Sequence, residues 1–286
     1  MAADSDAARP RVPPPVAEAV PSPGGAFARL VDIMRVLRSP DGCPWDREQT
    51  PASLAPFVLE EAHEVVDAIE RGDLHGLAGE VGDLIFEGVF LAQLCAEAGA
   101  FTAADALHHV NEKLIRRHPH VFTAEPAAAA VTSATDVVEQ WEAIKARERA
   151  GAQASRAGTL DGIPRTLPAL LAAHEIATRV SAVGFDWTRA EDVVSKIEEE
   201  VAELRQAVED EPPARAAEEL GDLLFAIASL ARKLGLEPEA ALRAANRKFA
   251  ARFRALEEEV ERRGHRVEAL PLEELEAIWQ AVKSDT

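Results

Sequence analysis

Two stretches of the sequence concentrate carboxylates at the same internal spacing. In the first stretch, Glu60, Glu61 and Glu64 are followed, after fifteen intervening residues, by the E-x-x-D pair Glu80 and Asp83. The same pattern returns 139 positions later with five further acidic residues, Glu199, Glu200, Glu203, Glu219 and Asp222. At about 100° per residue, the first three acids of each copy share one helix face, and each E-x-x-D pair shares a face of the next helix. If these helices form an antiparallel hairpin, the acidic faces meet.

Carboxylates crowded in this way repel one another and raise each other's pKa unless a cation neutralises them. Oxygen ligands alone suit Mg²⁺, with Mn²⁺ as an alternative, rather than zinc. A solvated acidic helix face would explain one such cluster, but its repetition favours a metal site in each copy. Gly82 and Gly221 stand beside the two aspartates, where glycine costs about 1 kcal/mol relative to alanine in a helix. They therefore indicate close approach of another helix or of a ligand.

Two other readings of the acidic residues have to be weighed. Glu60-x-x-His63 matches part of a di-iron carboxylate motif, but Ala202 replaces the histidine in the second copy and neither E-x-x-D contains one. The motif is therefore a poor match. The alternative from another functional class is a non-catalytic helical interaction or regulatory protein whose acidic clusters serve as solubility or docking surfaces.

Positively charged residues follow each acidic pair further along the chain. The segment "ALHHVNEKLIRR" aligns with "ALRAANRKFAAR". The alignment pairs an asparagine, a lysine and an arginine in each copy: Asn111, Lys113 and Arg117 with Asn246, Lys248 and Arg252. Beside a metal site such cations suit a polyphosphate, although they are also ordinary cations of a helix surface. No P-loop pattern is present, so a triphosphate would not be held in that manner.

The elements that must position these residues are helices, because Ala, Leu, Glu and Arg are abundant and strand-like alternation is scarce. We predict helices at 26–37, 53–70, 75–98 and 103–118, and again at 167–182, 190–209, 214–234, 238–262 and 273–283. The repeat predicts two homologous all-α domains, at 26–123 and 161–286. Residues 1–25 are expected to form a disordered tail, and residues 124–160 a linker with one short helix.

Composition narrows the function classes. The chain has 286 residues, of which 47% are apolar, and a formal charge of −19. This charge argues against binding a nucleic-acid polymer, but not against a small phosphorylated ligand held through a cation. No apolar run reaches the ~18 residues of a spanning helix, and the N-terminus lacks a secretory-signal pattern. With only Cys43 and Cys95, we expect a cytoplasmic protein without a membrane partner.

Several motifs together resemble the MazG family. "CPWDREQTPASLAPFVLEEAHEVVDAI", the following "EVGDL" and "KLIRRHPHVF" are similar to its first domain. "GFDW", "KIEEEVAEL", "EELGDLLFAIASLAR" and "NRKFAARF" are similar to its second. The resemblance covers about residues 26–283 and departs locally at His63, where an aromatic residue is frequent, and at Gly79-Glu80, where the lead-in is often more acidic. It implies tandem all-α pyrophosphatase domains, four-helix-bundle-like, whose sites are completed in a homodimer.

The resemblance also implies an activity, the conversion of a nucleoside triphosphate and water to the monophosphate and diphosphate. The substrates would be ribo- and deoxyribonucleoside triphosphates in a broad house-cleaning role; a damaged nucleotide or an alarmone is a narrower alternative. The implied metal ligands are four residues in each domain: Glu200, Glu203, Glu219 and Asp222 in the second, and Glu61, Glu64, Glu80 and Asp83 in the first. Glu199 and Glu60 would orient or deprotonate the attacking water. Bound Mg²⁺ would neutralise phosphate charge and activate that water for in-line attack.

Phosphate and base recognition rest on fewer signals. We expect Lys196, Lys248 and Arg252 to hold the β- and γ-phosphates. Trp279 and Lys283 would close over the nucleotide, although packing is the commoner role for such a tryptophan. Because Lys196 and the terminal "IWQAVK" have no clear counterpart in the first copy, we favour the second domain as the active one.

Overall fold

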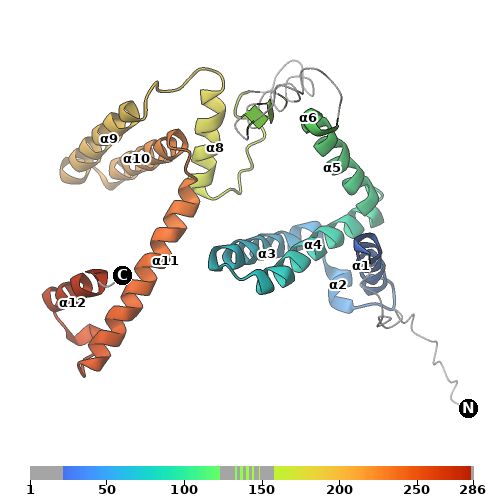
Figure 1. Cartoon of the computed structure of the whole chain (residues 1–286), viewed down its shortest axis with the longest axis horizontal. Helices are drawn as coiled ribbons and strands as arrows, with labels where there is room; N and C mark the ends of the chain where they lie inside the picture. Colours follow the sequence, from blue (N-terminus) through green and yellow to red (C-terminus); the bar gives the residue numbers. More distant parts are fainter. Residues whose placement is uncertain are drawn as a thin grey trace, which may run out of the picture. The chain divides into compact units, whose positions relative to one another are not determined.

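The chain divides into two compact units, Met1–Arg147 and Glu148–Thr286. The structure, a computed structural model, describes residues 22–122 and 158–284, together with a few isolated positions between them. Within those residues the secondary structure is helical and contains no strand (Figure 1). The predicted all-α class is therefore confirmed. No helix in the described part of the chain is long and apolar enough to cross a membrane. The tail to residue 21, and most of the predicted linker with its short helix, lie outside the described residues.

The first unit begins with the helix α1, Pro23–Leu37, and ends its described part with the short helix α6, Pro119–Phe122. Between them lie α2 (Pro44–Glu48), α3 (Pro51–Arg71), α4 (Leu74–Glu97) and α5 (Ala103–Arg117). The helix α1 starts three residues before the predicted bound because Ser22 caps it, with its Oγ accepting from the Gly25 N–H at 3.1 Å. Three residues assigned to the tail are thus helical. The short α2 and α6 were not predicted, since they are too short to produce a periodic pattern.

The helices α3 and α4 form the antiparallel hairpin on which the first acidic cluster depends (Figure 1). Gly72 ends α3 in the left-handed region at φ 69°, which glycine adopts without a steric penalty. Asp73 then caps α4, because its carboxylate accepts from the Gly76 N–H at 2.9 Å. This tight turn sets the acidic face of α3 against that of α4.

The hydrophobic core of the first unit lies at the end of the hairpin away from this turn. There α1 packs against α4, and the buried side chains are Met34, Leu54, Val89, Phe90 and Leu94. The ion pair between Arg38 and Glu97, at 2.6 Å, joins the C-terminal end of α1 to that of α4. The half of the hairpin nearer the turn is thereby left for the acidic cluster.

The second unit repeats the hairpin with a different turn. Its described helices are α8 (Ala169–Ser181), α9 (Ala190–Asp210), α10 (Pro213–Lys233), α11 (Pro238–Arg262), the 3₁₀ turn η2 (Val267–Ala269) and α12 (Leu272–Ser284). The chain leaves α9 at the extended Glu211, and Pro212 and Pro213 start α10, because a residue before proline avoids the helical region. The helix α8 packs on α10, and α12 packs on α11 around Leu256 and Ile278.

Apolar stripes remain exposed on both helices of the second hairpin. On α10, Leu220, Leu224 and Ile227 follow each other at helical spacing, and on α9 three valines do so at heptad spacing, namely Val194, Val201 and Val208. Their exposed fractions run from 39% to 69%. The equivalent α4 residues Val81 and Ile85 are 40% and 46% exposed. Each unit therefore leaves an apolar face that its own described helices do not cover.

Candidate metal centres

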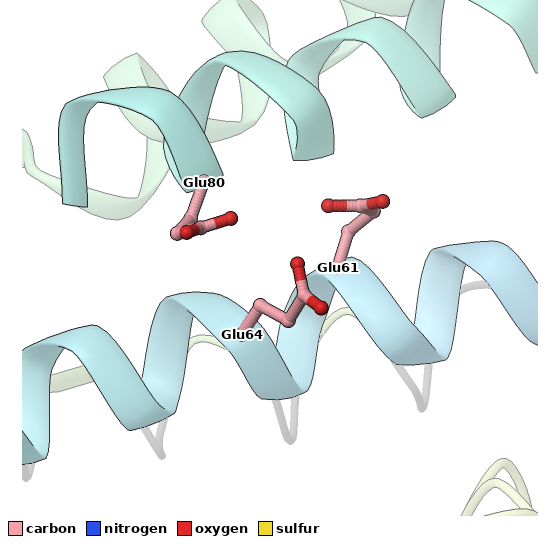
Figure 2. A group of neighbouring side chains, drawn as sticks. All are labelled: Glu61, Glu64 and Glu80. Atoms are coloured by element: carbon pink, nitrogen blue, oxygen red, sulfur yellow. The ribbon is translucent and has the colours of Figure 1, made fainter. Parts of the chain in front are cut away.

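The first acidic cluster is formed across the α3–α4 hairpin. One carboxylate oxygen from each of Glu61, Glu64 and Glu80 lies within 4.8 Å of the others. In Figure 2, Glu61 and Glu64 rise from α3 toward α4, and Glu80 reaches toward them from α4. Three of the four predicted ligands of the first domain are therefore within reach of one ion.

The remaining acids of this cluster act on it electrostatically. The pKa of Glu61 is raised, first by burial and then by the charges of Glu64, Asp83, Glu80 and Glu60. Asp83 is thus near Glu61, although it is not among the three side chains that converge most closely. Glu60 is exposed, and the di-iron alternative gains no support, because His63 is exposed and outside the group.

The second acidic cluster has the same position on the α9–α10 hairpin. One oxygen from each of Glu200, Glu219 and Asp222 lies within 4.8 Å of the others. Glu200 and Glu219 are only 5% and 2% exposed, and the Oε2 of Glu200 has no hydrogen-bond partner among the described residues. An unpartnered buried carboxylate oxygen needs a partner, so this donor set fits a bound cation. Glu203 is exposed and outside the trio, but its charge helps to raise the pKa of Glu219.

Two cations neutralise part of the second cluster. The Lys196 Nζ is 2.7 Å from Glu199 and 2.7 Å from Glu200, and these hydrogen bonds raise the pKa of Lys196. Arg215 forms ion pairs with Glu219 and Glu218. Arg215 was missed in the sequence, although its i, i+4 spacing to Glu219 is the signal that could have found it. In the first unit, the repeat puts Phe57 and Gly76 at these two positions.

Comparison with known proteins agrees with this repeated architecture. The family model described as the MazG nucleotide pyrophosphohydrolase domain matches residues 49–122, and that of phosphoribosyl-ATP pyrophosphohydrolase matches residues 174–249. The nucleoside triphosphate pyrophosphohydrolase of Escherichia coli K12 is 48% identical over 260 residues, covering 89% of this chain and 96% of the relative. The chain belongs to the MazG family. The nucleoside triphosphate pyrophosphohydrolase/pyrophosphatase MazG of Thermotoga maritima is 45% identical, covering 91% of this chain and 96% of the relative.

The other residues predicted to bind the substrate lie away from the acidic hairpins in sequence and on other helices. Asn246 and Lys248 are exposed on α11, Arg252 is half-buried there, and Lys283 is exposed on α12. Within residues 158–284, these four side chains make no hydrogen bond or ion pair with the acidic cluster of their own unit. In the first unit, Lys113 and Arg117 are half-buried on α5.

In the structure, Trp279 is part of the packing between two helices, and its contact with a nucleotide stays a prediction. The Trp279 ring lies 5.1 Å from that of Phe249, and Trp279 packs on the core between α11 and α12. Among the described residues of its own unit, no other helix closely approaches either mid-helix glycine, because a Cβ at Gly82 or Gly221 would meet no atom within 4 Å. That part of the expectation was wrong within each unit, whereas ligand approach stays a prediction.

Sequence reasoning also missed Glu87 in this MazG-family chain. Glu87 lies on α4 one turn after Asp83, is 6% exposed, and has an Oε2 without a hydrogen-bond partner among the described residues. Its pKa is raised by burial and by the charges of Glu61 and Asp83. The i, i+4 spacing from Asp83 was the available signal, but burial decides its importance and the sequence does not state burial.

The raised carboxylate pKa values predict how stability depends on pH. The pKa values of Glu61, Glu87 and Glu219 lie above 4.5 in the folded protein. The stability these groups contribute is therefore present at pH below 4.5 and is lost as the pH rises through their raised values. In EDTA, we expect this contribution to lower the Tm as the pH is raised from about 4.5 to neutral, and added Mg²⁺ to raise the Tm more at the higher pH.

Thermal unfolding with and without Mg²⁺ across this range measures the effect. The control is the double variant Glu61→Gln and Glu219→Gln, in which the pH dependence of the Mg²⁺-induced shift should flatten. The pKa values of some carboxylates, such as Glu97 and Glu259, are instead lowered by hydrogen bonds and ion pairs with arginines. The stability that these two contribute is lost as the pH falls, at pH values below this range. A Mg²⁺-induced shift that is equal at both ends of the range would contradict the prediction.

Proposed function

We infer that this MazG-family chain is a Mg²⁺-dependent nucleoside triphosphate pyrophosphohydrolase that converts ribo- and deoxyribonucleoside triphosphates to the monophosphate and diphosphate. The observation that carries the inference is the convergence of Glu200, Glu219 and Asp222 within 4.8 Å at a buried point of the α9–α10 hairpin. The names of the relatives at 48% and 45% identity support the same reaction.

The donor set suits a hard divalent cation. Its ligands are carboxylate oxygens without sulfur or imidazole, which favours Mg²⁺ or Mn²⁺ over zinc. Glu200, Glu203, Glu219 and Asp222 would hold it in the second unit, and Glu61, Glu64, Glu80 and Asp83 in the first. When bound, the cation would supply charge neutralisation at the phosphates and a more acidic water. Glu199, exposed beside this set and hydrogen-bonded to Lys196, would orient that water, and Glu60 is its equivalent.

We favour the second unit as the catalytic one. Lys196 lies 2.7 Å from the buried ligand Glu200, so it would be free to contact a phosphate once a metal ion neutralises that carboxylate. Arg215 likewise forms an ion pair with the buried Glu219, so it too would be free to contact a phosphate once a metal ion is bound. A triphosphate brings its own negative charge to the metal, and these two cations would then offset it. The first unit has neither cation at the equivalent positions.

A homodimer is part of the proposal. The stripe Leu220, Leu224 and Ile227 is an apolar face of a kind that marks an interaction site when it is contiguous. Asn246, Lys248 and Arg252 lie on α11, away from the acidic cluster of their own hairpin in sequence. In a symmetric pair, the stripe of one copy would be covered by the other, and α11 of the second copy would bring these residues toward the cluster. The free cysteines Cys43 and Cys95 fit the expected cytoplasmic location.

The test is product release from a substrate panel. The purified full chain is incubated with each of the eight common ribo- and deoxyribonucleoside triphosphates and Mg²⁺, and monophosphate and diphosphate are quantified by chromatography. We expect both products in equal amounts, none in EDTA, and recovery on adding Mg²⁺ or Mn²⁺. Adding damaged nucleotides and an alarmone to the panel separates broad house-cleaning from a narrow role. No release from any substrate would favour the non-catalytic alternative.

A further inference from the structure

Glu87 occupies a place that the four-ligand pattern does not explain. Its side chain is 94% buried, since only 6% of it is exposed, yet one oxygen has no hydrogen-bond partner among the described residues. Burying an ionised carboxylate without a partner costs several kcal/mol. No Lys or Arg within residues 22–122 forms an ion pair with it. A buried oxygen of this kind calls for a partner that a protein side chain does not provide here.

Helix geometry directs Glu87 toward the acidic cluster. Glu80, Asp83 and Glu87 follow the i, i+3, i+7 spacing of one helix face, and the α4 face bearing Glu80 is turned toward α3 (Figure 2). Glu87 lies about 10 Å beyond Glu80 along α4. In an antiparallel hairpin, this shift carries it past Glu64 toward Glu61 and the start of α3. The charges of Glu61 and Asp83 accordingly act on Glu87.

The two carboxylate oxygens of Glu61 point in different directions (Figure 2). One of its oxygens faces Glu64 and Glu80, while the other turns away from both (Figure 2). One oxygen of Glu61 belongs to the trio that converges within 4.8 Å. Beyond this trio, the charge of Asp83 acts on Glu61, and that of Glu61 acts on Glu87.

The two units differ in charge at this point. The first has six carboxylates, five from the repeated pattern and Glu87, and no paired Lys or Arg among the described residues. The second has five carboxylates and two paired cations, Lys196 and Arg215, and the position equivalent to Glu87 is the buried Ala226. At full ionisation the first cluster thus carries a formal charge of −6 and the second −3. The first needs more positive charge from outside the chain.

We propose that Glu87 is a further metal ligand of the first unit, which would hold a divalent cation together with Glu61 and Asp83 at a position that the second unit lacks. The oxygens of these three residues do not all converge within 4.8 Å in the structure, so the ion would draw them together. This deepens the proposed function, because it rests on the first cluster being a metal site, and it makes the two halves of the repeat unequal. The first unit would bind one more cation than the second.

The experiment counts Mn²⁺ bound to the full chain without nucleotide, from the free-Mn²⁺ electron paramagnetic resonance signal and by titration calorimetry. In Glu87→Gln, which keeps the shape of the side chain, we expect one Mn²⁺ fewer per chain, or a Kd for that ion raised about 10- to 100-fold. Glu87→Ala copies the residue of the second unit and should give the same loss. Glu48→Gln removes an equal charge at an exposed residue of α2 and should change neither number nor affinity.

The outcomes separate this inference from the proposed function. Unchanged Mn²⁺ number and affinity in both folded Glu87 variants, with wild-type circular dichroism, would overturn the proposal even if diphosphate is still released from a nucleotide. Loss of the ion in the variants would support it even if the wild-type chain hydrolysed no nucleotide, in which case only the proposed function would fail. If Glu87→Ala is unfolded, Glu87→Gln decides alone.

Discussion

Asp222→Asn and Glu200→Gln are each expected to lower the rate of diphosphate release about 100-fold or more. Each substitution keeps the size of the side chain but removes one anionic oxygen ligand from the trio that converges within 4.8 Å. Glu200→Gln is the more informative of the two variants, because Glu200 is only 5% exposed. The uncharged glutamine amide would leave the cation without part of the negative charge that balances it. Steady-state rates at saturating Mg²⁺ and nucleotide measure the effect.

The matched control is Glu198→Gln, which removes the same charge from an exposed residue two positions before Glu200. It should leave the rate within about twofold, because surface charges are worth little. Glu61→Gln applies the equivalent change to the first unit and should reduce the rate far less than Glu200→Gln. If the second-unit variants kept normal rates and Glu61→Gln lost activity, catalysis would belong to the first unit instead.

The combined variant Ile85→Glu and Leu224→Glu is expected to convert a dimer into monomers at micromolar concentration. The repeat sets these two residues at equivalent positions on α4 and α10, where they are 46% and 43% exposed. A carboxylate buried without a partner costs about 3 kcal/mol or more, which is a hundredfold or more in Kd. In a two-fold symmetric pair each substitution occurs twice. Sedimentation velocity measures the assembly, and the diphosphate release rate should fall with it.

Gln206→Glu is the control for this experiment, because it adds the same charge to an exposed α9 residue outside the valine stripe. It should remain dimeric and active. A wild-type chain that sediments as a monomer, or a combined variant that stays dimeric, would contradict the proposed homodimer. If a monomeric variant kept full activity, the proposed catalytic function would stand, but α11 of a second copy would not contribute to the site.

Helix prediction succeeded where periodic segments were long and failed where local chemistry set a boundary. The two acidic hairpins were predicted because their apolar and acidic residues repeat at helical spacing over some twenty residues. The start of α1 was missed, because Ser22 and Pro23 extend that helix into an Ala- and Pro-rich stretch. The turns of the two hairpins share no residue pattern, since one uses Gly72 and Asp73 and the other Glu211 and two prolines.

The candidate site divides in the same way. The spacing of the acidic residues was enough to predict a metal site in each copy, since helical periodicity determines which side chains share a face. The family resemblance then implied which four residues of each copy are the ligands. The role of Lys196 was less predictable. It was expected at a phosphate, whereas the structure has it at the carboxylates Glu199 and Glu200. Which partner a long cation contacts depends on what is bound, and the sequence carries no information about occupancy.

By itself, the sequence determined the helical class and the repeat, because both follow from residue type and spacing along one chain. Its motifs also resembled one family, and that resemblance implied the acidic ligand sets. Only the tertiary structure decided that Glu87 is buried beside the first cluster without a partner, that Arg215 neutralises part of the second, and that Trp279 packs on Phe249. Burial and pairing are properties of residues brought together across a hairpin or between helices. Two halves with one motif can therefore differ in the charge of their acidic clusters.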